Sequence, residues 1–151
     1  MKIIENLKTF GNLNESDLNS LEDELGISFP TDYKEFLSKT NGGCPKNNYL
    51  VLNVPSLKEE LLINFFLGVN DDENFNIISW NNDFKIEMPI STFIFGVEYG
   101  GGMFIQITEG DDKGVYFWDS NFSLPVTSND ENVFYIADTF SDFLSLITIE
   151  K

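Results

Sequence analysis

Two short glycine-rich turns divide the stretch from Ser91 to Trp118 into three apolar segments whose side chains alternate. Alternation with a period of two residues indicates β-strands, because successive strand side chains point to opposite faces of a sheet. The residues that share a face are Phe93, Phe95, Val97 and Tyr99 in the first segment and Met103, Ile105 and Ile107 in the second. The turns at Gly100–Gly102 and Gly110–Gly114 have hairpin length. The stretch therefore predicts antiparallel strands joined by two hairpins.

Two amphipathic helices are predicted ahead of this sheet. The first spans Glu15–Leu25, with Asn14 as its N-cap and Gly26 as its stop. The second runs from Pro30 to about Thr40, since proline is tolerated in a first helical turn where its missing N–H has no partner to lose. The sequence Asn41-Gly42-Gly43 ends this helix. Each helix has an apolar stripe that suits packing against a core.

The rest of the chain adds strands and shorter helical segments. We expect strands at Tyr49–Val54, Leu61–Val69 and Val133–Ile136, a helical turn at Ser56–Glu60, a short helix from Asp71 to Ser79 or Trp80, a polar loop at Leu124–Asn132 and a closing helix at Thr139–Thr148. The order of elements lacks βαβ alternation, and no repeat or linker divides the chain. The prediction is a single α+β domain over residues 1–151, with a central, mainly antiparallel sheet covered by the N-terminal and C-terminal helices.

The composition removes the most common catalytic mechanisms. The sequence contains no histidine, and its nine basic residues are all lysines, so arginine is absent as well. Without histidine the chain lacks an imidazole base, a Ser-His-Asp triad and a histidine metal ligand. Without arginine it lacks the planar group that binds phosphate or carboxylate through two parallel hydrogen bonds. We expect a protein that is not an enzyme and that carries no cofactor.

Acidic residues outnumber lysines by 25 to 9, which gives a formal net charge of −16. A charge of this sign and size repels nucleic acid and steers a basic partner toward the surface. The alternative interpretation is that the charge serves solubility alone. We expect a basic protein as the partner, and neither nucleic acid nor a membrane.

The acidic side chains form local groups that suit more than one kind of site. Ca²⁺ and Mg²⁺ prefer oxygen ligands, but none of the groups has the spacing of an EF-hand loop. Pairs of carboxylates also hydrolyse glycosidic bonds, but 25 carboxylates nominate no particular pair. For recognition of a basic partner we nominate Asp71, Asp72, Glu73, Glu109, Asp111, Asp112, Asp119, Asp130 and Glu131. Candidate aromatic anchors, each of which also suits the core, are Trp80, Tyr99, Trp118 and Phe122.

Cysteine usage and hydropathy indicate a cytoplasmic protein. Cys44 is the one cysteine, so it forms no internal disulfide, and we expect a free thiol in a loop. The first residues reach a charge before the apolar centre of a secretory signal develops. The longest apolar stretch, Leu61–Val69, is interrupted by Asn64 and is much shorter than the roughly 20 residues that span a bilayer.

A longer pattern in the first third of the chain resembles a known family. Its elements are Leu21-Glu22, Leu25-Gly26, Phe29-Pro30, Asp32-Tyr33-Lys34, Phe36-Leu37 and Asn41-Gly42-Gly43. In this order and at this spacing they resemble the N-terminal signature of the SUKH superfamily. The resemblance continues through Met88-Pro89-Ile90, Phe95-Gly96, Gly100–Gly102, Gly114-Val115-Tyr116 and Ile136–Leu144, and it is weakest between Leu57 and Glu87.

The resemblance implies an α+β fold with a central antiparallel sheet. Bacterial domains of this kind are similar to immunity proteins that bind and neutralise secreted toxins, often nucleases, of contact-dependent and polymorphic toxin systems. The fungal members resemble regulators of cell-wall glucan synthesis. The family supplies no catalytic residues. The resemblance therefore favours an immunity protein for a cognate toxin domain, with a regulatory or scaffold module as the alternative.

Overall fold

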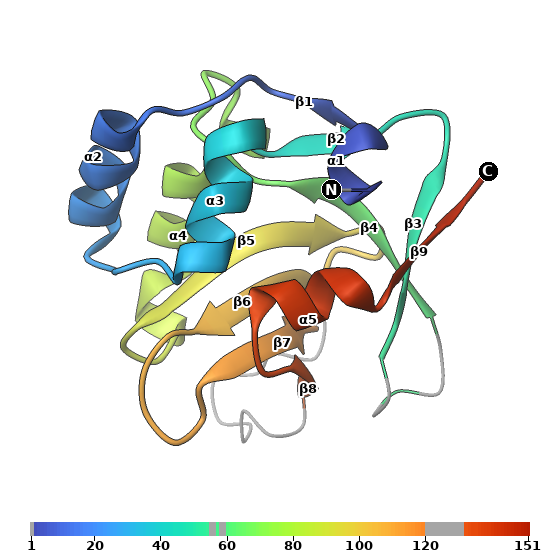
Figure 1. Cartoon of the computed structure of the whole chain (residues 1–151). Coiled ribbons are helices and arrows are strands. Elements are labelled where there is room, and N and C mark those ends of the chain that lie inside the picture. The colour runs from blue at the N-terminus through green and yellow to red at the C-terminus, as the bar shows by residue number, and fades with distance from the viewer. Residues whose placement is uncertain (1, 55–56, 58–59, 120–131) are drawn as a thin grey trace.

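The computed structural model describes residues 2–54, 57, 60–119 and 132–151 (Figure 1). Its α-helices are α1 (Lys2–Glu5), α2 (Glu15–Leu25), α3 (Thr31–Thr40), α4 (Ile77–Phe84) and α5 (Phe140–Ser145), and its 3₁₀ helices are η1 (Glu73–Phe75) and η2 (Lys85–Glu87). Its strands are β1 (Leu7–Thr9), β2 (Gly43–Pro45), β3 (Tyr49–Asn53), β4 (Glu60–Phe66), β5 (Thr92–Glu98), β6 (Met103–Ile107), β7 (Gly114–Trp118), β8 (Val133–Ala137) and β9 (Ile147–Glu150). None of the described helices is long and apolar enough to cross a membrane.

The described strands form one sheet of nine strands, and each pair of neighbouring strands is antiparallel. The main path runs β1-β2-β4-β5-β6-β7-β8, while β3 pairs with β4 and β9 pairs with β3. The hairpins β5–β6 and β6–β7 form at the two predicted glycine-rich turns. The predicted α+β class and the antiparallel sheet are therefore confirmed.

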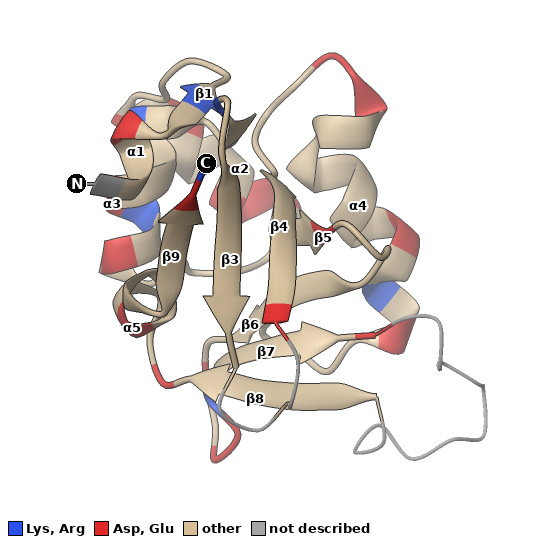
Figure 2. Ribbon diagram, turned by 90° about the vertical axis from the view of Figure 1, so that its right-hand side faces the viewer, with Lys and Arg blue, Asp and Glu red and all other residues tan. Residues whose placement is uncertain are grey.

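Helices α3 and α5 cover one face of the sheet, as predicted for the N-terminal and C-terminal helices (Figure 2). Tyr33 of α3 packs against Phe93 and Phe95 of β5, with ring centroids 4.9 and 6.0 Å apart. Phe140 and Phe143 of α5 pack edge-on against Phe95 at 5.3 and 5.2 Å. Aromatic rings in this arrangement bury large apolar areas and hold the helices at fixed positions on the sheet.

Helix α4 covers part of the opposite face (Figure 2). A short helix was predicted in this part of the chain, but the sequence did not assign it to a face of the sheet. The ring of Trp80 in α4 packs against that of Phe65 in β4, with ring centroids 6.3 Å apart. The ring of Phe84 packs against that of Trp118 in β7, with ring centroids 5.6 Å apart. Phe66, the next residue of β4, contacts the α3 ring of Phe36 on the other face. Because neighbouring strand residues point to opposite faces, the Phe65-Phe66 pair supplies both layers of the core.

Helices α2 and α3 begin and end where local signals in the sequence predicted. Asn14 and Asp17 form a capping box at the start of α2, and Gly26 ends it in the left-handed conformation at φ 68°. Pro30 precedes the first residue of α3, and Asn41 ends that helix with φ 52°. Capping and stop signals act through backbone groups within four residues, so they are legible without knowledge of the fold.

The Asn41-Gly42-Gly43 exit from α3 serves the fold through close backbone contacts. The Asn41 amide accepts the N–H of Val69 at 2.7 Å and donates to the Val69 carbonyl at 2.9 Å. Gly42 has φ 82°, and a β-carbon there would lie 2.5 Å from the carbonyl oxygen of Phe66. Only glycine fits such an approach between two backbones. Through these hydrogen bonds and this close backbone approach, the motif fixes the end of α3 against the end of β4 and the segment that follows it.

The structure corrects the helix predicted to start at Asp71. Asp72 instead caps η1, with its carboxylate accepting the N–H of Asn74 at 3.0 Å, and α4 begins only at Ile77. The helix then continues to Phe84, beyond the predicted end at Ser79 or Trp80. Aspartate side chains that bond to nearby backbone N–H groups favour turns over helix propagation, which explains the later start.

The closing helix predicted over Thr139–Thr148 is also too long. Helix α5 stops at Ser145, and Ile147–Glu150 forms β9, which pairs with residues Tyr49–Leu52 of β3. Ile147, Thr148 and Ile149 are β-branched, so they lose side-chain freedom in a helix and fit a strand well. Pairing with β3, which lies about a hundred residues earlier in the chain, favours the strand over the helix for these residues.

The N-terminal strands were not predicted. Strands β1 and β2 have three residues each, and Cys44 lies in β2 opposite Lys8 rather than in a loop. Burial raises the pKa of the free Cys44 thiol, while the charge of Lys8 opposes that shift. Strands this short show no periodicity. Most of the helical turn predicted at Ser56–Glu60 and of the loop predicted at Leu124–Asn132 lies outside the described residues.

Candidate partner-binding surface

The nominated acidic residues lie in turns at the ends of strands and helices. Asp71 and Asp72 precede η1, which contains Glu73, while Glu109, Asp111 and Asp112 lie in the turn between β6 and β7 and Asp119 follows β7. Except for Asp119, which is partly buried, these side chains are exposed. Asp130 and Glu131, and the candidate anchor Phe122, lie outside the described residues.

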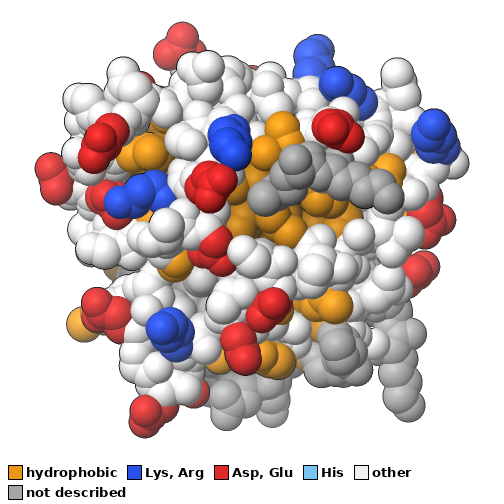
Figure 3. Space-filling model, viewed as in Figure 1, with side chains coloured by type: hydrophobic (Ala, Val, Ile, Leu, Met, Phe, Trp, Pro, Cys, Tyr) orange, Lys and Arg blue, Asp and Glu red, His pale blue; other side chains and the backbone are white. Residues whose placement is uncertain are grey.

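The two main groups do not meet in one acidic patch. The loop with Asp71–Glu73 lies at the top of the molecule in Figures 1 and 2, and the turn with Glu109–Asp112 lies at the bottom in both views. On the face that contains α3 and α5, acidic side chains are scattered among lysines and uncharged side chains (Figure 3). The nominated residues that the structure describes are surface groups, apart from the partly buried Asp119, but their positions in the sequence do not indicate which of them share a surface.

Lysines neutralise little of this charge. Two ion pairs join described residues to one another, Lys34 with Glu22 at 3.3 Å and Lys39 with Glu35 at 3.0 Å. Both pairs belong to α2 and α3, which contain none of the nominated residues. Since the whole chain has 25 acidic residues, the surface keeps a large negative excess that acts on charged molecules around it.

A pair of acidic residues that the sequence analysis did not nominate together lies at one edge of the sheet. Burial raises the pKa of Glu98, hydrogen bonds from the Gly100 N–H and other backbone groups lower it, and the negative charge of Asp119 raises it further. Glu98 ends β5 and Asp119 follows β7. Both strands run antiparallel to β6, so their carboxyl ends meet at the same edge. The two predicted hairpins are therefore sufficient to place Glu98 and Asp119 at the same edge of the sheet.

Among the described residues, no group of three side chains from His, Cys, Asp and Glu is arranged to hold a metal ion. The acidic turns instead make local hydrogen bonds. Glu109 accepts the hydroxyl of Ser91 at 3.2 Å, and the carbonyl oxygen of Asp112 accepts the hydroxyl of Tyr116 at 2.6 Å. These bonds constrain the β6–β7 turn, and its acidic residues Glu109, Asp111 and Asp112 are exposed to solvent.

Two of the nominated aromatic residues lie beside nominated carboxylates. Trp80 and Glu73 line a shallow groove of about 550 Å³ together with Asp83. Trp118 and Asp112 line a cleft of about 250 Å³ with Ile105 and Ile107. Trp118 is nevertheless almost fully buried and belongs to the core, whereas Tyr99 is half exposed.

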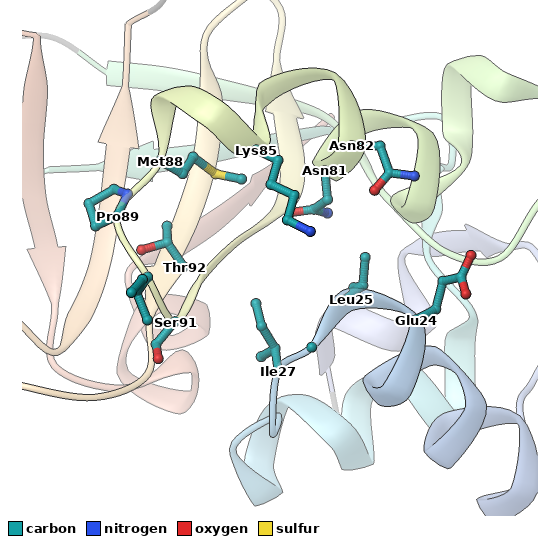
Figure 4. Close-up of a pocket in the computed structure, with 12 residues that line it drawn as sticks. Glu24, Leu25, Ile27, Asn81, Asn82, Lys85, Met88, Pro89, Ser91 and Thr92 are labelled. Carbon is teal, nitrogen blue, oxygen red and sulfur yellow. The ribbon is translucent and has the colours of Figure 1, made fainter.

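A further cleft of about 270 Å³ lies between the end of α2, helix α4 and the segment that leads into β5 (Figure 4). Lys85, the first residue of η2, extends toward Leu25 and Ile27, and Glu24 lies at the rim (Figure 4). The described residues of its lining offer one ammonium group, one carboxylate and two side-chain amides. One of these amides, that of Asn81, is already hydrogen-bonded to Ile94 of β5. This mixture suits contact with a protein surface.

Comparison with known proteins assigns the family. The model of the SMI1 / KNR4 family (SUKH-1) matches residues 12–146, and no curated protein matches the chain. The match begins before α2 and ends after α5, so it includes the central strands and all the residues that line the clefts described above. It confirms the resemblance seen in the N-terminal motif. On this evidence of sequence and fold together, the chain belongs to the SMI1 / KNR4 family (SUKH-1).

Proposed function

We propose that this chain is an immunity protein that binds a secreted toxin domain in the cytoplasm and blocks its active surface. In this proposal the chain acts by occupying that surface, and it needs neither catalysis nor a cofactor. Membership of the SUKH-1 family carries the proposal, because bacterial SUKH domains are similar to toxin-neutralising proteins. The excess of acidic side chains supports a basic partner.

A nuclease toxin fits this electrostatic requirement. Such an enzyme presents lysines and arginines to phosphate groups, and an acidic protein competes with nucleic acid for the same side chains. Long-range attraction between opposite charges raises the rate of association toward roughly 10⁸ M⁻¹s⁻¹ at low salt. Fast capture suits an immunity protein, which must bind the toxin before the toxin reaches its substrate.

The test is co-expression of this chain with the C-terminal domain of the protein encoded immediately upstream. We expect that domain alone to stop growth, and that this chain restores growth and co-purifies with it. An upstream domain that is harmless and does not bind would contradict the proposal and favour a regulatory or scaffold module. Altered cell walls on deletion of the gene in toxin-free cells would support that alternative.

The rate of complex formation tests the electrostatic part separately. The variant Glu109→Gln/Asp111→Asn/Asp112→Asn removes three exposed charges from the β6–β7 turn, and Asp23→Asn/Glu60→Gln/Glu150→Gln removes three from other elements. We expect the turn variant to associate more slowly than this control at low salt. The difference should vanish at high salt, where the screening length falls to about 3 Å. Equal rates at low salt would exclude the turn from the encounter surface.

A further inference from the structure

The segment Lys85–Ser91, here called the ridge, projects two large apolar side chains into solvent. Ile86 is 100% exposed and Ile90 is 91% exposed, more than any other large apolar residue among those described. Single exposed apolar residues are common on protein surfaces, but two isoleucines within five positions form a compact apolar projection. Neither contributes burial to the fold.

The ridge is held in place from both ends. It follows α4 directly through η2, and Met88 in its middle packs against the core. At its far end the Ser91 carbonyl accepts the N–H and the hydroxyl of Thr108 at 2.8 and 3.1 Å. Ser91 has φ 64°, which is unfavourable for a residue with a side chain and persists only where neighbouring contacts impose it. Ile90 therefore points outward because the turn is constrained.

Clefts flank the ridge on both sides. Met88 and Pro89 line both the cleft of about 270 Å³ beside α2 and the cleft of about 250 Å³ over β6 and β7. Apolar side chains lie in each of them, Ile27 in the first and Ile107 in the second. A projection between two concave surfaces gives an interlocking contact with a partner, which is the geometry of well-packed interface centres.

The charges around the ridge indicate what kind of partner fits. Glu24 lines the first cleft, Glu87 and Asp112 line the second, and Glu109 is bonded to Ser91 at the end of the ridge. Among the described residues, Lys85 is the one lysine that lines either cleft, so the described part of the rim is net negative. A second copy of this chain would bring two such rims and two net charges of −16 together. Charge complementarity instead favours a basic protein surface.

We propose that the ridge is the apolar anchor of the partner interface, and that Ile86 and Ile90 insert into an apolar pocket rimmed by lysine and arginine on the toxin domain. This inference rests on the proposed function and adds the location of the contact. The acidic rim accelerates the encounter, and burial of the two isoleucines slows dissociation. The two contributions are separable by kinetics.

The experiment measures binding of the purified upstream C-terminal toxin domain to the full chain and to two double variants. Ile86→Ala/Ile90→Ala removes the projection, and Tyr49→Ala/Val69→Ala removes two exposed apolar side chains elsewhere. We expect the ridge variant to raise Kd by about 100-fold, mainly through faster dissociation, and the control to change it less than about threefold. The melting temperature of the ridge variant should equal that of the wild type.

Each result decides a different point. If the wild type rescues growth and binds, but the ridge variant binds as the control does, the ridge proposal is wrong and the immunity proposal stands. If the wild type neither rescues nor binds, both fall together. Sedimentation of the free chain gives a third decision: a wild-type dimer that dissociates in the ridge variant would overturn the proposal and assign the ridge to self-association.

Discussion

Two adjacent asparagines of α4 occupy opposite environments. The Asn81 side chain accepts the N–H of Ile94 at 2.8 Å and donates to the Ile94 carbonyl at 3.0 Å, while Asn82 is exposed. β4 pairs with β5 only up to Gly96, so Ile94 has no strand partner on that side, and the Asn81 amide takes the place of one. A single side chain thus completes the hydrogen bonding of a central strand.

Asn81→Ala leaves a buried donor and a buried acceptor of Ile94 without partners. We expect the free energy of unfolding to fall by about 3 kcal/mol, because unmet backbone groups keep their full cost of desolvation. Asn82→Ala is the matched control and should change stability by less than about 0.5 kcal/mol. Urea denaturation of both variants measures the difference. Equal midpoints would show that water replaces the Asn81 amide at no cost.

At the scale of elements, the C-terminal strand β9 is the clearest case of an element that depends on pairing with a distant part of the chain. It covers the free edge of β3 through four residue pairs from Tyr49–Glu150 to Leu52–Ile147. An uncovered edge presents unpaired backbone groups to solvent and to other chains. The short strand therefore stabilises the branch of the sheet formed by β3.

Removal of residues 147–151 should lower the free energy of unfolding by about 2–4 kcal/mol, from the lost hydrogen bonds and the partial burial of Ile147 and Ile149. It should also increase aggregation, since the β3 edge becomes available for pairing. Removal of Lys151 alone, which lies beyond the strand, is the control. Chemical denaturation and light scattering check the two effects. A truncated chain as stable as the control would show that β3 needs no partner on this edge.

At the scale of the whole molecule, self-repulsion dominates the electrostatics of the free chain. The net charge is −16, and the ion pairs between described residues involve four side chains, Glu22, Lys34, Glu35 and Lys39. Exposed pairs of this kind contribute little, whereas like charges spread over a compact surface disfavour the folded state. Added salt screens the repulsion more than it weakens these pairs.

We therefore expect the melting temperature at pH 7 to rise with sodium chloride, from about 0.01 M, where the screening length is about 30 Å, to about 1 M, where it is about 3 Å. Scanning calorimetry measures the effect. The triple turn variant, with three fewer negative charges, should melt higher at low salt and depend less on salt. A melting temperature that falls with salt would mean that favourable ion pairs outweigh the repulsion.

Much of the fold is predictable from local signals in the sequence. The ends of α2 and α3 follow from Asn14, Gly26 and Asn41, since capping groups act within one helical turn. The hairpins follow from their glycines, and the edge shared by Glu98 and Asp119 follows from the hairpins. The family follows from a spaced motif that lies within the region matched by the family model.

The sequence by itself determined the class of fold, the hairpin core, the main helices and the negative charge, because composition and short-range backbone chemistry need no distant partner. Only the tertiary structure decided that residues 147–150 form a strand, that Asn81 rather than Asn82 is buried, and that the Lys85–Ser91 ridge projects between two clefts. The reason is physical. Strand pairing, burial and exposure depend on residues brought together across the whole chain, and the same local sequence is compatible with either outcome until its neighbours are in place.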